Sequence, residues 1–322
     1  MRYGSVCSGI EAATVAWESL GFTPAWFAQF DPEHNYKRGP DFPSAVLEKH
    51  YPLTPNIGDM TKIAQQVRAG DVEAPDIVVG GTPCQSYSIG GLRKGMNDPR
   101  GQLTLSYVDL ADAIDRKREE QNKQAAIFVW ENVPGVLSSK DNAFGCLLAG
   151  LAGEDCELQP PGGKWKNAGC VYGPQRAVAW VIKDSQYFGV AQRRPRVLLI
   201  ASARRDADPA KILFEREGMR RDDTPTRQTA LPVCLTARGA GSLDDRETYV
   251  VESGGRIRHL TPLENERQMG FPDNYTRISW KGRPEEECPD GPRYKAIGNS
   301  MAIPVMRWLG ERINKILNGE DA

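Results

Sequence analysis

A cysteine that follows two glycines and a proline is the first residue whose surroundings suggest chemistry. Cys84 lies in the sequence Gly-Gly-Thr-Pro-Cys-Gln (residues 80–85), after an apolar run and before a stretch rich in glycine and basic residues (90–95). A thiol at the end of a strand and near cationic side chains can ionise and act as a nucleophile. An isolated cysteine is more often a small buried hydrophobe, and the local sequence leaves that alternative open.

An acid and two arginines lie next to two other apolar runs. Glu131 follows residues 127–130, and Arg194 and Arg196 precede residues 197–200. A carboxyl group in a pocket can donate a proton to a substrate. Two guanidinium groups on one side of a strand can bind carbonyl or anionic oxygens. The alternatives are a helix cap or a solvated carboxylate for Glu131 and a basic surface for the arginines.

The elements that would position these residues alternate between strand and helix. Hydrophobic patterns predict strands at 3–6, 25–30, 76–79, 127–130, 177–182 and 197–201, and helices at 11–20, 44–50, 102–118 and 302–317. Such alternation predicts an α/β fold with a doubly wound, mostly parallel sheet. Ligands of these sheets bind outside the carboxyl ends of the strands, where the residues above are expected. The alternation fails between about 203 and 258.

Composition excludes several classes of protein. The chain has 322 residues, of which 40% are hydrophobic and 26% charged, and it contains no apolar run of membrane length. Residues 1–6 have no apolar signal-peptide pattern, so we do not expect secretion by such a signal. Seven cysteines without a Cys-x-x-Cys pair and only three histidines favour a reduced, cytoplasmic protein without a structural metal.

The net charge of −1 argues against a protein covered with basic residues. Residues 193–227, however, contain ten basic residues and six acids, a local excess of +4. A narrow basic face could therefore still contact nucleic acid.

Five motifs, each weak by itself, occur in one order along nearly the whole chain. They are Pro83-Cys84-Gln85, Glu131-Asn132-Val133, Gln192-x-Arg194-x-Arg196, the stretch from Arg258-x-Leu260-Thr261-Pro262-x-Glu264 to Gly270-Phe271-Pro272, and Gly298-Asn299-Ser300. In this order and spacing the chain resembles the DNA (cytosine-5)-methyltransferases from about residue 3 to residue 317. The resemblance implies a Rossmann-like fold for S-adenosylmethionine, with a catalytic domain at 1–202 plus 290–322 and a small target-recognition domain at 203–289.

The resemblance also implies a role for each catalytic candidate. The Cys84 thiolate would add to C6 of cytosine while Glu131 protonates or hydrogen-bonds N3, and the activated C5 would take the methyl group. Loss of the C5 proton would then expel Cys84. Arg196 would hold the base through O2, with Arg194 in support. A base inside a duplex cannot be attacked in this way, so the cytosine must be flipped out of the stack.

The cofactor site implied by the resemblance lies mainly in the first sixty residues. Cys7 stands where the family has an aromatic residue, Glu11 where it often has a second glycine, and Gln29 where it has an acid. We therefore favour Asp31 as the partner of the ribose, with Phe30 as a wall for adenine. The full set is Cys7, Ser8, Gly9, Ile10, Glu11, Gln29, Phe30, Asp31, Asp59, Met60, Gly81, Pro83, Leu103, Asn299 and Ser300.

Two features near this site have alternative interpretations. Asp59 matches the family's acceptor for the adenine amino group, and it could also cap a helix. The polar segment 34–42 looks like an insertion after the second strand, and we expect a surface loop there.

DNA contacts are expected from two segments. Residues 86–100 would form a lid over the flipped base, and the variable region 203–258 would read the sequence. The candidate residues are Gln85, Tyr87, Ser88, Arg93, Lys94, Thr236 and Arg238. Because the net charge is near zero, few phosphate contacts and a modest salt dependence are expected.

The expected partner is double-stranded DNA, and we expect no association with a membrane. We expect a monomer in the cytoplasm of a bacterial cell, encoded by the bacterium or by a phage, with a cognate restriction endonuclease as a possible partner. Two alternatives stay open: cytosine-5 methylation of tRNA, and a DNA-binding or regulatory module without catalysis.

Overall fold

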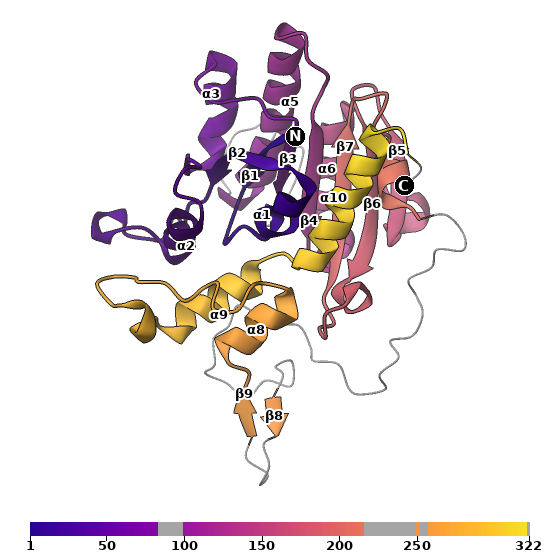
Figure 1. Cartoon of the computed structure of the whole chain (residues 1–322). Helices are drawn as coiled ribbons and strands as arrows, with labels where there is room; N and C mark the ends of the chain where they lie inside the picture. Colours follow the sequence, from indigo (N-terminus) through magenta and orange to yellow (C-terminus); the bar gives the residue numbers. More distant parts are fainter. Residues whose placement is uncertain (83–98, 216–248, 252–256, 321–322) are drawn as a thin grey trace.

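The computed structural model describes residues 1–82, 99–215, 249–251 and 257–320 (Figure 1). Within these residues, no helix combines the length and the apolar character needed to cross a membrane.

A seven-stranded sheet forms the centre of the protein. Its strand order is β2-β1-β3-β4-β7-β6-β5. The bounds are β1 (Arg2–Val6), β2 (Thr23–Ala28), β3 (Ile77–Gly80), β4 (Ile127–Asn132), β5 (Ala168–Tyr172), β6 (Ala177–Asp184) and β7 (Pro195–Ser202). The pairings from β2 to β4 are parallel, and those from β4 to β5 are antiparallel. Five strands therefore run in one direction and two in the other, which confirms the mostly parallel sheet.

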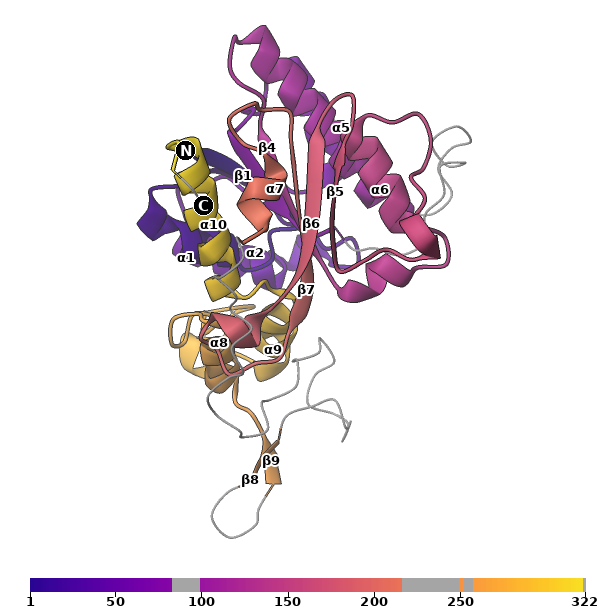
Figure 2. The same cartoon turned by 90° about the vertical axis from the view of Figure 1, so that its right-hand side faces the viewer.

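Helices cover both faces of this sheet (Figures 1 and 2). One face carries α1 (Ala12–Trp17), α7 (Pro209–Leu213) and α10 (Ile303–Leu317), and the other carries α3 (Ile63–Ala69), α5 (Pro99–Glu120) and α6 (Ala143–Ala152). Alternate residues of a strand point to opposite faces, so in β3 Ile77 and Val79 enter the first core and Val78 the second. The doubly wound architecture is confirmed.

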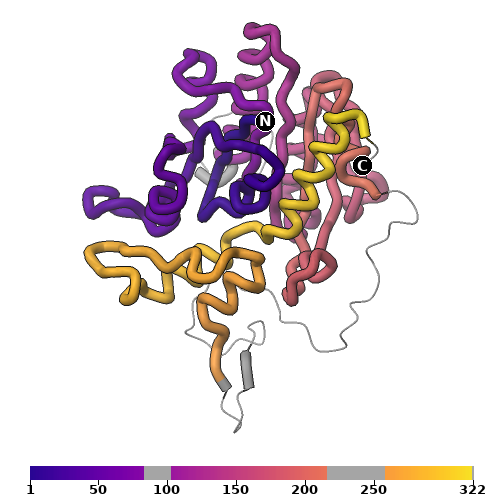
Figure 3. Tube along the Cα trace, in the orientation of Figure 1, coloured from indigo at the N-terminus to yellow at the C-terminus, as the bar shows by residue number. Residues whose placement is uncertain are grey.

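The two ends of the chain meet on one face. Helix α10 packs beside α1, as the yellow and indigo segments of Figure 3 show. The indole N–H of Trp17 donates to the carbonyl of Met306 at 2.7 Å, and a Cβ on Gly310 would lie 2.6 Å from that same indole nitrogen. Close helix packing therefore needs glycine at this position.

The remaining elements are short or lie outside the sheet. They are α2 (Phe42–His50), α8 (Pro262–Met269), α9 (Asp290–Asn299), the two-stranded pair β8 (Tyr249–Val251) and β9 (Ile257–His259), and 3₁₀ turns at Glu18–Leu20, Tyr36–Arg38, Met60–Lys62, Pro134–Ser138, Pro161–Gly163, Ser185–Phe188 and Glu285–Glu287.

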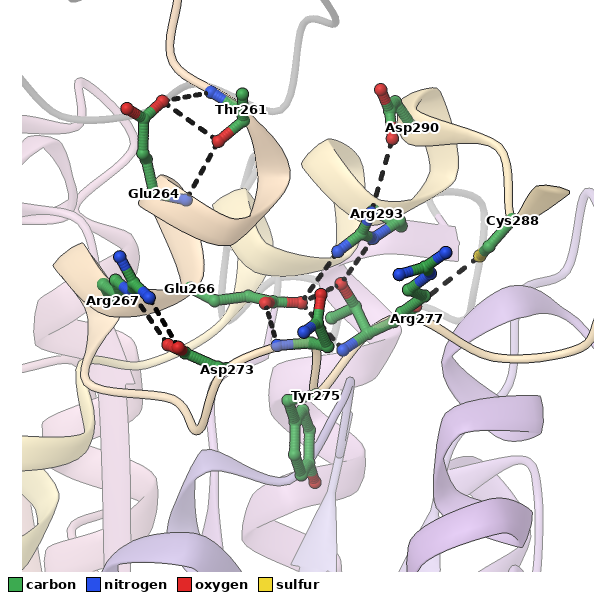
Figure 4. A network of polar contacts seen from close by, with 12 residues as sticks. Thr261, Glu264, Glu266, Arg267, Asp273, Tyr275, Arg277, Cys288, Asp290 and Arg293 are labelled. Carbon is green, nitrogen blue, oxygen red and sulfur yellow. Dashed lines mark hydrogen bonds and ion pairs between the residues drawn. The ribbon is translucent and has the colours of Figure 1, made fainter. Parts of the chain in front are cut away.

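A buried ion pair holds α8 and α9 together (Figure 4). The carboxylate of Glu266, in α8, is fully buried. It accepts the backbone N–H groups of Asn274 and Thr276, both at 2.8 Å, the Thr276 hydroxyl, and the Arg293 guanidinium of α9 at 3.3 Å. A buried carboxylate needs such compensation, so this network organises the segment that follows the variable region.

Three strands, β2, β7 and β5, differ from what the sequence predicted. β2 ends at Ala28, two residues early, so Gln29 and Phe30 lie in the connection that follows. β7 begins at Pro195, which places Arg196 inside the strand. β5 was not expected, because it is an edge strand without a buried apolar face.

The recognition domain at 203–289 stays a prediction. Part of it packs against the catalytic core, because α7 lies on β6, β7 and α10. The Tyr275 hydroxyl also donates to the carbonyl of Ile10 at 2.8 Å, which ties the α8–α9 segment to the turn after β1.

Candidate active site

Three parallel strands end side by side at the candidate site. Val6, Gly80 and Trp130 are register partners at the carboxyl ends of β1, β3 and β4. A Cβ on Gly80 would lie 2.1 Å from the carbonyl oxygen of Val6, and one on Gly81 2.6 Å from that of Glu131. The two glycines therefore let the chain leave β3 in direct contact with Glu131.

Glu131 forms an ion pair with Arg196 of the neighbouring strand β7. Its Oε1 is 3.1 Å from the Arg196 Nε, and the two side chains are only 15% and 16% exposed. Burial raises the pKa of Glu131, while the positive charges of Arg196 and Arg194 act against that increase. A buried carboxyl with a raised pKa beside a cation can exchange a proton or a hydrogen bond with a bound base.

Arg194 has a different environment from Arg196. It is 3% exposed, and its Nη2 donates to the carbonyl oxygens of Gly298 at 2.9 Å and Ser300 at 2.7 Å. Its backbone N–H donates to Asp184 at 2.7 Å. Arg194 thus links the start of β7 to the turn between α9 and α10, as a supporting residue would.

The chain just before Pro83 is held by side chains of β4. The amide of Asn132 donates to the carbonyl of Thr82 at 2.7 Å, and the indole of Trp130 donates to the Thr82 hydroxyl at 2.9 Å. Thr82 is buried. The sequence analysis missed this residue, although a polar side chain between glycine and Pro-Cys was a visible signal.

The turn after β1 contains three residues in the left-handed region. Cys7, Gly9 and Glu11 have φ angles of 49°, 57° and 59°. Ser8 ties this turn to β2, because its hydroxyl accepts the N–H of Ala28 at 3.0 Å. Among the residues that the structure describes, none has an atom within 4 Å of a Cβ built on Gly9, so none of them crowds the turn at this position.

Two residues of this turn depart from the family pattern: Glu11 is buried and Cys7 is half-buried. Glu11 is 1% exposed and accepts the Thr14 hydroxyl at 2.7 Å. Burial raises its pKa to about 7. Burial also raises the pKa of the Cys7 thiol to about 12, so this thiol stays neutral. Cys7 contacts the sulfur of Met60 at 3.5 Å.

Two other expected cofactor residues, Leu103 and Asp59, have contacts that the structure describes. Leu103 packs in the same apolar core as Cys7 and Met60. Asp59 caps the 3₁₀ turn that follows it, since its Oδ1 accepts the N–H of Thr61 at 3.0 Å and the Thr61 hydroxyl at 2.8 Å. The capping interpretation of Asp59 is therefore confirmed.

The end of β2 places a glutamine, an aromatic ring and an acid in succession. Both amide atoms of Gln29 are used inside the protein: Oε1 accepts the N–H of Gly9 at 2.9 Å, and Nε2 donates to Asp41 at 3.2 Å. Phe30 is 44% exposed. Asp31 accepts the N–H of its near neighbour Glu33 through Oδ1 at 3.0 Å.

These residues fit an adenosyl cofactor. A backbone turn open to its surroundings, an exposed aromatic face at Phe30 and carboxylates at Asp31 and Asp59 are the groups that a nucleoside requires. At the other end, Ser300 is buried and Asn299 is exposed. Across the described ranges, no three His, Cys, Asp or Glu side chains are grouped so that they could hold a metal ion.

Several expected residues lie outside the described part of the chain and stay predictions. They are Pro83, Cys84, Gln85, Tyr87, Ser88, Arg93, Lys94, Thr236 and Arg238.

Comparisons with known proteins identify the family of the chain. The family model described as C-5 cytosine-specific DNA methylase matches residues 1–230 and 216–315. The chain is 41% identical to a DNA N-6-adenine-methyltransferase of Escherichia phage P1 over 97% of its length, and it spans 61% of that relative. It is 25% identical to the type II methyltransferase M2.BsuMI of Bacillus subtilis, covering 98% of the chain and 76% of the relative.

Solved structures share the fold. A methyltransferase of Entamoeba histolytica superposes with a TM-score of 0.62 at 16% identity, covering 97% of both chains. The S. pombe Dnmt2 methyltransferase gives 0.61 at 15% identity, over 96% of this chain and 97% of the other. The fold, the order of the motifs and the family match lead to one conclusion: this chain belongs to the C-5 cytosine-specific DNA methylase family.

Proposed function

We propose that the protein transfers a methyl group from S-adenosylmethionine to C5 of cytosine in double-stranded DNA. The observation that carries this proposal is the largely buried ion pair of Glu131 and Arg196, in which Glu131 lies against Gly81 at the end of β3. An acid and a cation at this sheet edge, and a cysteine three residues after Gly81 in the sequence, are the groups that activation of cytosine requires.

Each residue has a defined task in the proposed reaction. The Cys84 thiolate adds to C6 of a flipped cytosine, and Glu131 donates a proton or a hydrogen bond to N3. Arg196 binds O2 of the base, and Arg194 holds the start of β7 in place through its two backbone carbonyl contacts. After C5 has been methylated and has lost its proton, Cys84 leaves by β-elimination and the free thiol is restored.

The cofactor site is proposed at the turn after β1 and the end of β2. Phe30 would face the adenine, Asp31 the ribose and Asp59 the adenine amino group. S-adenosylmethionine supplies the electrophilic methyl group when it is bound. The open turn at Gly9 leaves room for the ligand beside the backbone.

The test is incubation with tritiated S-adenosylmethionine and duplex DNA, followed by nucleoside analysis. We expect the label in 5-methylcytosine, and a Cys84→Ala variant without turnover. A Cys84→Ala variant with full turnover would contradict the nucleophile. A covalent complex of the wild type with DNA that contains 5-fluorocytosine is the independent check, because loss of the C5 proton is blocked there.

The name of the phage P1 relative supports a second candidate, methylation of adenine N6. The family match over residues 1–315 favours cytosine instead, and label in N6-methyladenine would reverse that preference. Comparison of duplex DNA with tRNA as the acceptor tests the RNA alternative. A monomer, a recognition domain at 203–289, and a role beside a restriction endonuclease are further parts of this proposal.

A further inference from the structure

The segment that looked like an insertion, residues 34–42, is built into the end of β2. The ring of Tyr36 stacks on Phe30 with ring centroids 5.3 Å apart and planes 6° from parallel. Tyr36 is 40% exposed and Phe30 44%. Because the ring of Tyr36 covers one face of the Phe30 ring, a second planar ring can stack only on the opposite face of Phe30. The rings of His34 and Tyr36 lie edge to face, with their centroids 4.9 Å apart.

Two hydrogen bonds fix the orientation of Tyr36. Its hydroxyl donates to Oδ2 of Asp41 at 2.9 Å and accepts the backbone N–H of Asp31 at 2.8 Å. The stacked ring is thus anchored at its far end, and its plane sets the plane of Phe30. An aromatic pair that is held in this way loses little rotational freedom when a ligand stacks on it.

Asp41 connects the same segment to the turn after β1. It is 2% exposed, and its Oδ2 also accepts Nε2 of Gln29, whose Oε1 in turn accepts the N–H of Gly9. A continuous chain of hydrogen bonds therefore runs from Tyr36 through Asp41 and Gln29 to Gly9. The segment contacts both parts of the candidate cofactor site.

We propose that Tyr36 is a positioning residue for the adenosyl group, because it holds Phe30 in the plane on which a purine ring stacks. This inference rests on the proposed cofactor site, and it assigns a role to a segment that the sequence analysis interpreted as a surface loop. The ligand class is an adenine nucleoside. Asp41 also caps α2 through Ser44, so Tyr36 is the residue to change.

The test measures binding of S-adenosylhomocysteine by calorimetry to the full chain and to Tyr36→Leu and Tyr36→Phe. Loss of an aromatic pair corresponds to about two- to tenfold weaker binding, which we expect for Tyr36→Leu. Tyr36→Phe keeps the stack and loses the anchors, so a smaller loss is expected. Tyr172→Leu is the matched control, because Tyr172 is an exposed tyrosine on β5, and wild-type affinity is expected there.

Steady-state kinetics distinguishes a specific effect on binding of the cofactor from a general disturbance of the folded protein. For Tyr36→Leu we expect a raised KM for S-adenosylmethionine, with kcat and the KM for DNA unchanged. Wild-type affinity in Tyr36→Leu, or equal increases in both KM values, would overturn the inference. Absence of nucleoside binding in the wild type would instead refute the proposed function, so the two failures are distinguishable. Unfolding midpoints show whether each variant is folded.

Discussion

The buried carboxyl of Glu11 leads to a quantitative prediction. The hydroxyl of Thr14 donates to this carboxyl at 2.7 Å, and burial raises the pKa of Glu11 from 4.5 to about 7. The folded protein therefore holds this proton more tightly than the unfolded chain does. Glu11→Gln keeps the shape of the side chain and the left-handed backbone, and it removes only the titration.

The magnitude follows from the difference between the two pKa values. Below pH 4.5 Glu11 is protonated in both states, and its full contribution to stability is present. Between pH 4.5 and 7 the unfolded chain loses the proton and the folded protein keeps it, so stability falls as pH rises. A shift of this size corresponds to about 3 kcal/mol. Above pH 7 the contribution of the Glu11 proton to the free energy of unfolding is lost completely, whereas residue 11 of the Gln variant does not titrate and causes no such loss.

Urea unfolding of the wild type and Glu11→Gln at several pH values tests this reasoning. The free energy of unfolding of the variant, relative to the wild type, should increase by about 3 kcal/mol between pH 4.5 and pH 8. Titration of all other groups is common to both proteins and cancels in the difference. A difference that stays constant over this range would refute the raised pKa, whatever its size.

Three more predictions concern the α8–α9 network and the active site. Arg293→Met leaves a buried carboxylate without its cation, and urea unfolding should show a loss of about 3–5 kcal/mol. Gly81→Ala places a Cβ 2.6 Å from the carbonyl oxygen of Glu131, and methyl incorporation should fall by about tenfold or more. Gly135→Ala is the control and should retain activity, because no atom of the described residues lies within 4 Å of its Cβ. Arg196→Gln removes a charge that lowers the pKa of Glu131, so the pH–rate profile of its residual activity should move to higher pH.

Much of the fold could be predicted because a strand that is buried on both faces leaves a continuous apolar run in the sequence, and a helix that is buried on one face leaves an apolar period. The run Ile77–Gly80 reads as a buried strand because its residues alternate between two apolar cores. The same logic fails at the sheet edge, where β5 exposes alternate residues and carries no apolar run. It also fails at strand ends, because the apolar Phe30 extends the pattern of β2 beyond its last paired residue, Ala28.

The residue types of the candidate site could be predicted from the sequence, but the contacts between their side chains could not. Glu131 and Arg196 were both candidates, but their pairing depends on β4 lying antiparallel to β7, in a register that sets Glu131 opposite Leu198. Gln29 stood in the position of an acid, and only the structure shows that its amide is occupied by Gly9 and Asp41.

The sequence by itself determined the alternation of strands and helices, the order of the motifs and therefore the family. These properties are local, because each depends on residue type and spacing within a short segment. The tertiary structure alone decided the partners: Arg196 for Glu131, the carbonyls of Gly298 and Ser300 for Arg194, and Tyr36 for Phe30. Such contacts depend on strand order and on the path of a loop in space, which hydrophobic periodicity does not encode.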